Sequence, residues 1–205
     1  MENAAAKMKI EFVDPELYMS NNIAIVGSSG SVTDNKHGDL IDSFEDIVRF
    51  NTAITEGYEM YVGSRTTLRI VNNVVLGCHY NGDKFVTRLR NSRLLYYGPD
   101  RGLWKNKNKY LHKSVEAFEF DYKKMSGCRS IVEMGSDKKL RIGFGFIVLC
   151  VISGVKPHLF GFDIRDRERD HYWEEAPELG GHHNHKEEKD TVKRLIEDEK
   201  IIFHE

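Results

Sequence analysis

Three histidines lie within four positions of the segment GHHNHKEEKD, at residues 181–190: His182, His183 and His185. An imidazole titrates near neutral pH, so it can take a proton from a hydroxyl group, and its ring nitrogens can also bind a metal ion. The spacing of the three matches none of the helical metal-binding signatures. The segment therefore leaves three interpretations open, which are general-base catalysis, metal binding and the solvent-exposed start of a charged helix.

The turn VGSSGS, at residues 26–31, is a second candidate for chemistry. It follows the apolar run of residues 23–26, as the end of a buried strand would. Glycine permits a positive φ there, and exposed backbone N–H groups and serine hydroxyls can approach an anion. The turn matches neither the dinucleotide-binding fingerprint nor the phosphate loop with its lysine. Alone, it is typical either of a phosphate site or of an ordinary tight turn.

The elements that would position these residues alternate along the chain. Short β-branched and apolar runs predict strands at residues 23–26, 46–51, 68–73, 84–89, 93–98, 129–135 and 158–163. Helical patterns occupy residues 38–45, 114–124, 143–153 and 186–200, and a polar surface loop with Trp104 occupies residues 99–110. This alternation favours a single Rossmann-like α/β/α sandwich around a mostly parallel sheet, in which ligands bind beyond the carboxyl ends of the strands.

Composition excludes several classes of function. The 205 residues suit a single domain, and 30 basic against 32 acidic residues, a formal net charge of -2, leave no large field for holding nucleic acid or anionic lipid. The longest apolar run, residues 147–152, is far shorter than the ~20 residues of a membrane-spanning helix. Cys78, Cys128 and Cys150 form neither a disulfide framework nor a zinc pattern, and the N-terminus has no signal-peptide features. We therefore expect a cytoplasmic or otherwise soluble intracellular protein that is not secreted and has no transmembrane segment.

Four segments of the chain carry recognisable motifs in a known order. The first, residues 23–73, contains the glycine-serine turn and then Gly38, Ile41–Asp42, Val48–Asn51 and Val62–Thr67. The others are a glycine-initiated apolar helix with a strand ending in FGF at 141–163, HYWE at 171–174, and His-x-x-x-x-Glu at 183–188. These segments resemble the large, small, third and very small sialylmotifs. The chain is thus similar to the eukaryotic-type sialyltransferases of glycosyltransferase family twenty-nine.

The resemblance implies a variant GT-A glycosyltransferase fold, with residues 1–205 forming one domain and residues 1–20 an N-terminal extension of it. It implies an inverting enzyme that needs no metal or other cofactor and moves sialic acid from CMP-sialic acid to a glycan hydroxyl. Its partners would be a nucleotide-sugar donor and a glycan acceptor, with no nucleic acid. Similar proteins from plants and algae imply CMP-Kdo as an alternative donor.

The resemblance also implies roles for particular residues. The donor's phosphate and ribose would lie against residues of the large motif, namely Gly27, Ser28, Ser29, Gly30, Ser31 and Asn51. Gly143 and the strand end Phe160, Gly161 and Phe162 would form the other wall of the donor pocket. His183 falls on the general base, and His171 falls on a histidine that contacts the donor phosphate. His182 with Glu187 satisfies the same spacing one register earlier, and Glu188 would orient the loop or cap the helix that follows it.

Two departures from the family pattern bear on these expectations. Ile23 and Gly154 replace the cysteines of the family's disulfide, as suits a protein folded in a reducing compartment. Arg141 and Ile142 replace hydroxyl residues that help to hold the donor in relatives, which leaves the donor's identity open. Two other classes remain as alternatives: a nucleotide- or glycan-binding module without activity, and a metal-dependent hydrolase that uses the histidines with Asp163 or Asp170.

Overall fold

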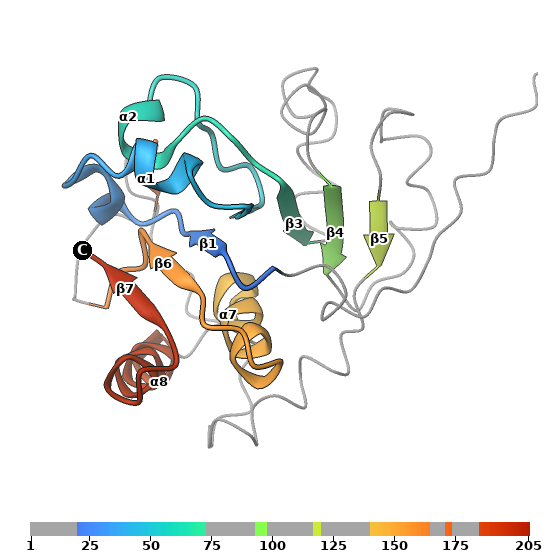
Figure 1. The fold of residues 1–205 in the computed structure, drawn as a ribbon, viewed down its shortest axis with the longest axis vertical. Helices are drawn as coiled ribbons and strands as arrows, with labels where there is room; N and C mark the ends of the chain where they lie inside the picture. The colour runs from blue at the N-terminus through green and yellow to red at the C-terminus, as the bar shows by residue number, and fades with distance from the viewer. Residues whose placement is uncertain (1–19, 73–92, 98–116, 120–139, 165–170, 174–184) are drawn as a thin grey trace, which may run out of the picture.

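The computed structural model describes residues 20–72, 93–97, 117–119, 140–164, 171–173 and 185–205. Within these residues, a 7-stranded parallel sheet has the strand order β5-β4-β3-β2-β1-β6-β7 (Figure 1). The strands are β1 (Ile23–Val26), β2 (Asp46–Phe50), β3 (Leu68–Asn72), β4 (Arg93–Tyr97), β5 (Ala117–Glu119), β6 (His158–Phe160) and β7 (Ile202–His204). Because all of them are parallel, their carboxyl ends lie along one edge of the sheet.

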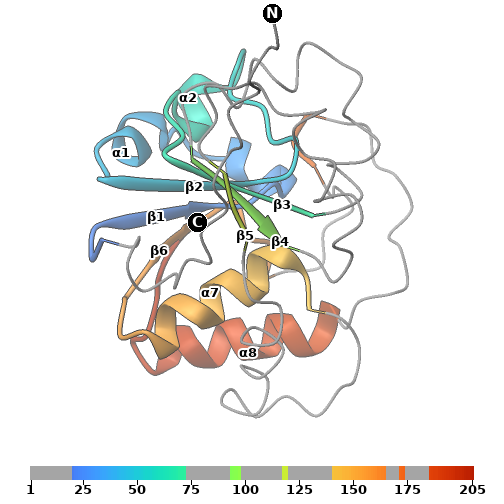
Figure 2. The same cartoon turned by 90° about the vertical axis from the view of Figure 1, so that its right-hand side faces the viewer.

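Helices cover both faces of this sheet. The short helices α1 (Gly38–Asp42) and α2 (Glu59–Val62) lie on one face, and the 3-10 helix η2 (Gly30–Thr33) follows the turn after β1. The longer helices α7 (Ile142–Ile152) and α8 (His185–Glu197) lie side by side on the opposite face (Figure 2). The predicted α/β/α sandwich around a parallel sheet is therefore confirmed.

The strand β1 is buried on both sides, and its residues alternate between two apolar clusters. Ile23 and Ile25 pack in the cluster that contains α7 and α8, whereas Ala24 and Val26 lie in the cluster next to α1 and α2. This alternation follows from the two-residue period of a strand. A strand that is covered on both faces must be apolar throughout, which explains the uninterrupted run of residues 23–26.

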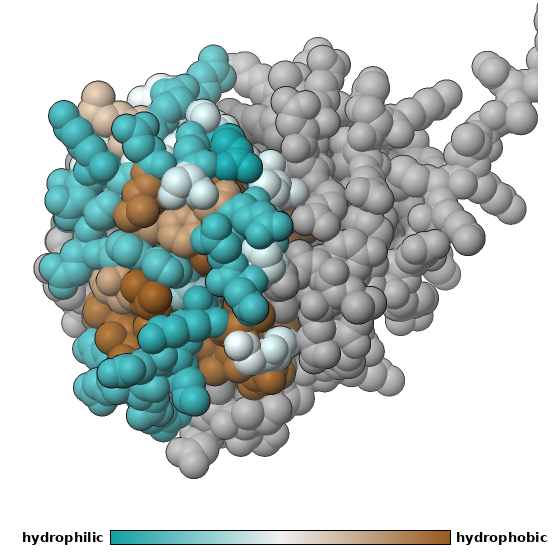
Figure 3. All heavy atoms as spheres, viewed as in Figure 1, coloured by the Kyte–Doolittle hydropathy of each residue, from teal (hydrophilic) through white to brown (hydrophobic). Residues whose placement is uncertain are grey.

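The two long helices differ in how much of their surface is apolar. All residues of α7 from Gly143 to Cys150 are buried, and burial raises the pKa of the Cys150 thiol. In α8 only one side is apolar, because Val192 and Leu195 join the core whereas charged side chains such as Lys193 are exposed. Hydrophilic side chains, drawn in teal, cover the region of α8 in Figure 3. The predicted buried helix and the predicted charged surface helix are both confirmed.

The other predicted elements have mixed outcomes. The strands at 23–26, 46–51, 68–73, 93–98 and 158–163 and the helix at 38–45 are confirmed, with small differences at their ends. The helix predicted at 114–124 is wrong at its described residues, because residues 117–119 form β5 and pair in parallel with β4. Aromatic residues at every second position of FEFDY have the period of a strand, and sheet pairing prevails here over helix propensity. The predicted strands 84–89 and 129–135 and the loop 99–110 lie outside the described residues.

Candidate functional site

The strand order of the sheet reverses next to β1. From β1 the chain adds β2, β3, β4 and β5 on one side, and it then returns to add β6 and β7 on the other side. In an open parallel sheet, ligands bind beyond the carboxyl ends of the strands at such a reversal. The turns that follow β1 and β6, residues 27–29 and 161–163, lie at this point and define the candidate site.

These two turns touch through their backbones. Gly27 N donates a hydrogen bond of 2.7 Å to Phe160 O, and Ser29 N donates one of 3.0 Å to Gly161 O. A Cβ atom at Gly27 would lie only 2.3 Å from Gly161 O, and Gly161 itself has a φ of +66°. Glycine is therefore needed at both positions, at Gly27 for the close approach and at Gly161 for the left-handed backbone.

Serine side chains shape the turn after β1. Ser29 is the N-cap of η2, and its Oγ accepts hydrogen bonds from Ser31 N at 3.3 Å and from Ser31 Oγ at 3.1 Å. Ser28 is partly exposed and makes no side-chain hydrogen bond within the part of the chain that the structure describes. The turn is thus held by two of its hydroxyls, and the hydroxyl of Ser28 is available to a ligand.

Three further segments meet on the α7 side of the site. Gly143 lies in the first turn of α7, where a Cβ atom would be 3.2 Å from Phe162 Cε1 and 3.4 Å from Phe50 Cε2. The rings of Phe50 and Phe162 pack edge to face with their centroids 6.4 Å apart. Asn51 follows Phe50 directly, at the carboxyl end of β2. The structure therefore brings together predicted donor-site residues from β1, β2, α7 and β6.

Asn51 has an unusual backbone conformation, with a positive φ of 47°. Its N–H donates to Ile70 O at 2.8 Å, and its carbonyl accepts from Arg69 Nη1 at 2.9 Å. Asparagine enters the left-handed region more readily than most residues. Neighbouring residues of β3 thus hold both backbone groups of Asn51, whose side chain is partly exposed.

The HYWE segment connects the turn after β1 to the residues that follow β2 through Tyr172, which the sequence analysis did not single out. Tyr172 N donates to Ser28 O at 2.9 Å, and the Tyr172 hydroxyl donates to Ile54 O. Its ring is buried, whereas the neighbouring rings of His171 and Trp173 are partly exposed and stack with centroids 4.7 Å apart. The predicted phosphate-contacting His171 is therefore directly next to a residue that is bonded to the glycine-serine turn.

Glu188 connects the starts of the two long helices. It is 1% exposed, and its carboxylate accepts a hydrogen bond of 2.8 Å from Arg141 N and forms an ion pair with Arg141 Nε. Arg141 is the N-cap residue of α7. The predicted capping role of Glu188 is corrected in one respect: it binds the start of α7, where N–H groups lack partners within the helix. It lies in the first turn of α8.

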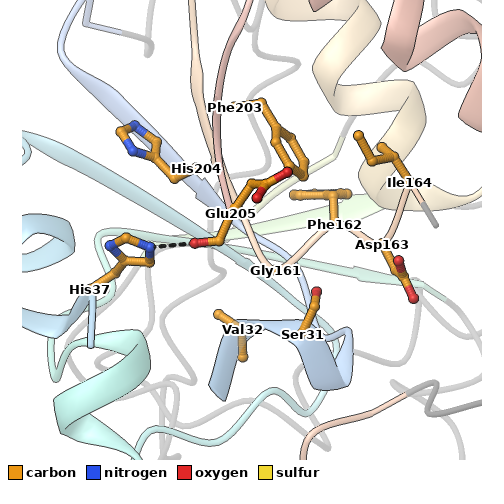
Figure 4. A pocket seen from close by; sticks show the side chains of 10 residues that line it. All are labelled: Ser31, Val32, His37, Gly161, Phe162, Asp163, Ile164, Phe203, His204 and Glu205. Carbon is orange, nitrogen blue, oxygen red and sulfur yellow. Dashed lines mark hydrogen bonds between the residues drawn. The ribbon is translucent and has the colours of Figure 1, made fainter. Parts of the chain in front are cut away.

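Figure 4 shows a small pocket between the turn after β1 and the end of β7. It is lined by Ser31, Val32, His37, residues 161–164 and residues 203–205. His37 Nε2 lies 2.7 Å from Glu205 O. Burial lowers the pKa of His204 to about 4, and the nearby His158 and His37 act in the same direction. The end of β7 therefore borders the predicted donor site at Ser31.

Phe160 contributes to this region from inside the core. Its ring is 0% exposed and stacks on the ring of His204 with centroids 4.2 Å apart. Its carbonyl is already used by the N–H of Gly27. A donor bound at this edge would therefore meet Gly161 and Phe162 first, since the ring of Phe160 is covered.

The predicted general base His183 and its rival His182 lie outside the described residues, so that role stays a prediction. His185 is the first residue of α8. In the described part of the chain, no three His, Cys, Asp or Glu side chains form a group that could hold a metal ion. The same residues contain no helix that is both long and apolar enough to span a membrane.

Fold and site together define a Rossmann-like α/β protein whose candidate site lies where the strand order of its parallel sheet reverses. Residues 8–96 of this chain match the family described as glycosyltransferase family 29 (sialyltransferase). The resemblance found in the sequence is therefore confirmed, and over these residues the chain is related to that family.

Curated relatives match over shorter segments. The beta-galactoside alpha-2,6-sialyltransferase 2 of Gallus gallus is 47% identical over 53 residues, which are 26% of this chain and 10% of that protein. The beta-1,6-galactosyltransferase GALT29A of Arabidopsis thaliana is 41% identical over 64 residues, 31% of this chain and 16% of that protein. The matched segments thus cover a small part of either relative.

Solved structures resemble nearly the whole chain. A mammalian sialyltransferase in complex with Gal-beta-1-3GalNAc-ortho-nitrophenol has a TM-score of 0.70 at 21% identity, covering 94% of this chain and 73% of that one. A second structure of a mammalian sialyltransferase has a TM-score of 0.65 at 22% identity, with the same coverage of 94% and 73%. The predicted glycosyltransferase fold is therefore confirmed.

Proposed function

We propose that the protein is a glycosyltransferase of the sialyltransferase type, which transfers sialic acid from CMP-sialic acid to a glycan hydroxyl with inversion and without a metal ion. One observation carries the proposal: the turn after β1, Asn51 and the contact between Gly143 and Phe162 meet where the strand order reverses. The family match over residues 8–96 and the sialyltransferase fold support it.

The donor's phosphate and ribose would lie against the turn after β1. The hydroxyl of Ser28 is available there, and Asn51 is partly exposed at the adjacent strand end. A hydroxyl and an amide can both donate hydrogen bonds to phosphate oxygens. Gly143 lets the start of α7 pack closely at this edge, because a side chain there would crowd the rings of Phe162 and Phe50.

In the proposed reaction, His183 removes the proton of the acceptor hydroxyl, and the hydroxyl oxygen attacks the anomeric carbon of the donor sugar. The bond from that carbon to the phosphate oxygen breaks on the opposite face, and CMP leaves with the bonding electrons. His171 stabilises the charge that develops on the phosphate. The bond between Tyr172 N and Ser28 O supports this role, because it holds the HYWE segment at the glycine-serine turn.

The sugar of the donor has a second candidate. The side chain of Arg141, which stands in place of a hydroxyl residue of the family, is paired with Glu188. The two relatives are named for different sugars, since one is a sialyltransferase and the other a galactosyltransferase. The sugar of the donor is thus open, and CMP-Kdo, another keto-acid donor, stays an alternative to CMP-sialic acid.

A mass-spectrometric assay tests the proposal by offering CMP-sialic acid, CMP-Kdo and UDP-galactose with a panel of glycans. Transfer of sialic acid at a rate that EDTA does not change is the expected result. Transfer of Kdo or galactose alone would correct the donor, and CMP binding without any transfer would indicate a binding module. A rate that EDTA abolishes would contradict the metal-independent scheme.

Two variants separate catalysis from donor binding. His183→Ala should abolish transfer without weakening CMP, because the base acts on the acceptor, and His182→Ala is its matched control. Asn51→Ala should weaken CMP about tenfold, as the loss of one hydrogen bond to a charged group predicts. The transfer assay measures the activity of each variant, and calorimetric titration measures its affinity for CMP. If His182→Ala and not His183→Ala abolished transfer, the base would be the earlier histidine.

A further inference from the structure

The left-handed backbone of Asn51 requires a cause. Among the described residues other than glycine, only Asn51 and Glu199 have a positive φ, 47° and 54°. Asparagine tolerates this conformation better than most residues, but a left-handed residue with a side chain still costs free energy and is held in place by its surroundings, and such positions are common at functional sites. Asn51 lies at the carboxyl edge of the sheet, where the candidate site is.

One buried side chain provides the enforcement. Arg69 lies on β3 and is 3% exposed. Its Nη1 donates hydrogen bonds of 2.9 Å to Asn51 O and 3.0 Å to Ala53 O. These two carbonyls lie on either side of Thr52, so a single nitrogen atom holds both ends of the turn, while Ile70 O accepts the N–H of Asn51.

Stability alone is a poor reason for this arrangement. A guanidinium loses favourable hydration when it is buried, and turns can satisfy their carbonyls with water or with backbone N–H groups. Arg49 lies beside Arg69 in the sheet register and is buried as well. Two like charges on neighbouring strands repel each other. Arg49 donates instead to the carbonyls of Val62, Gly63 and Arg65.

We propose that Arg69 is a positioning residue: it locks the turn after β2 in the left-handed form and so holds the side chain of Asn51 ready for the nucleotide. Only the last step rests on the proposed function. Arg69 acts through the backbone of Asn51 and not through contact with the ligand. Arginine suits this task because its planar fork has fixed donor directions, whereas a lysine is a mobile point charge.

A double-mutant cycle tests, without any ligand, whether Arg69 holds the turn after β2 in its left-handed form. It compares the free energies of unfolding of the wild type, Arg69→Lys, Asn51→Gly and the double variant. Glycine adopts a positive φ without strain, so Arg69→Lys should destabilise the Asn51→Gly protein by about half as much as the wild type. Equal losses in the free energy of unfolding in both backgrounds would overturn the proposal that Arg69 holds the backbone of Asn51. If Arg69→Lys does not fold, Arg69→Gln takes its place in the cycle.

Arg49→Lys is the matched control, because this arginine is equally buried but donates to other carbonyls. Its effect on stability should be the same with Asn51 or with glycine at that position. Titration with CMP then tests whether this backbone contact helps to bind the nucleotide. Arg69→Lys should weaken CMP binding about tenfold, and Arg49→Lys should weaken it no more than about twofold. Unchanged CMP affinity in Arg69→Lys, with a weakened Asn51→Ala, would overturn the positioning role. If the wild type binds no CMP, the proposed CMP-sugar donor is wrong, and the double-mutant cycle alone tests whether Arg69 holds the backbone of Asn51.

Discussion

The two faces of the sheet are built from different chemistry. On the side of α7 and α8, the core is a continuous apolar cluster that includes Ile25 and Ile147. On the side of α1 and α2, the helices are 5 and 4 residues long, and buried polar groups such as Arg49, Arg69 and the Tyr172 hydroxyl bind the backbone of the turns. Apolar packing therefore holds helices on both faces, but on the side of α1 and α2 buried hydrogen bonds also shape the edge where a ligand would bind.

The difference has a physical basis. Apolar packing is strong but weakly directional, so it holds helices on a sheet without fixing individual carbonyls. Hydrogen bonds from buried cations are directional and fix particular atoms. Burial lowers the pKa of Arg49 to about 10, so this side chain keeps its charge at neutral pH. The two faces should therefore respond differently to mutation.

The largest effect should come from the apolar face. Ile147 is 0% exposed, and Ile147→Ala should lower the free energy of unfolding by about 2–5 kcal/mol through lost packing and a cavity. Urea denaturation measures this loss, and CMP affinity of the folded variant should be unchanged. Ile152→Ala on the same helix is the control, because Ile152 is 37% exposed. A loss of CMP affinity without a loss of stability would contradict the different roles given to the two faces.

The next largest effect should come from Gly27, in the turn after β1. A Cβ atom there would lie 2.3 Å from Gly161 O, so Gly27→Ala should cost about 1–3 kcal/mol of stability through forced backbone shifts. It should also weaken CMP, since the turn after β1 must move. Gly57→Ala is the control, because Gly57 has a φ of +82° but nothing within 4 Å of its Cβ position. Equal CMP affinity in the two variants would contradict the placement of the donor.

A smaller effect should come from Tyr172→Phe on the polar face. This change keeps the buried ring but removes the hydroxyl that donates to Ile54 O, so it should cost about 1 kcal/mol. CMP affinity should fall more than this modest loss of stability suggests, because the lost bond joins the HYWE segment, which is bonded to the turn after β1, to the residues that follow β2. The control is Tyr58→Phe, whose ring packs against Tyr172 at 5.0 Å. Thermal unfolding and CMP titration of both variants would sharpen the division between the faces.

The smallest effect should be a pH dependence near β7. The pKa of His204 is about 4 in the folded protein, below its ordinary value of 6.5. As the pH falls through 6.5 the unfolded chain takes up this proton first, so the contribution of His204 is complete above that pH and is lost progressively toward about 4. The pKa of His158 is also lowered by burial and acts in the same direction. His204→Asn should flatten the fall in Tm between these pH values. An unchanged slope of Tm against pH would contradict the contribution of His204.

The parts of the fold that could be predicted have local signals. The apolar run of β1, the glycines after it and the continuous apolar helix α7 each occupy consecutive residues, and the structure confirms all three. The wrong helix at 114–124 marks the limit of this reasoning. Residues 117–119 are a strand that pairs with β4; the alternating aromatic residues of FEFDY were a local signal for it, whereas the partner strand cannot be read from one segment alone.

The polar supports of the site could not be predicted in the same way. Arg141 and Glu188 are 47 residues apart, and Tyr172 and Ile54 are 118 apart. Bonds between such distant positions leave no periodic pattern in the sequence. One usable signal was present, because a charged residue within a strand that is covered on both faces must find buried acceptors. Arg49 and Arg69 carry that signal.

The ion pair between Arg141 and Glu188 has an electrostatic consequence for the site. The first turn of a helix attracts anions, yet at α7 a buried carboxylate already occupies the N–H of the cap residue. A phosphate that approached this helix start would meet a resident negative charge, offset by the arginine beside it. In the proposed donor site, attraction for a phosphate ester would then have to arise from the uncharged donors of the serine turn and from the imidazole of His171, next to Tyr172.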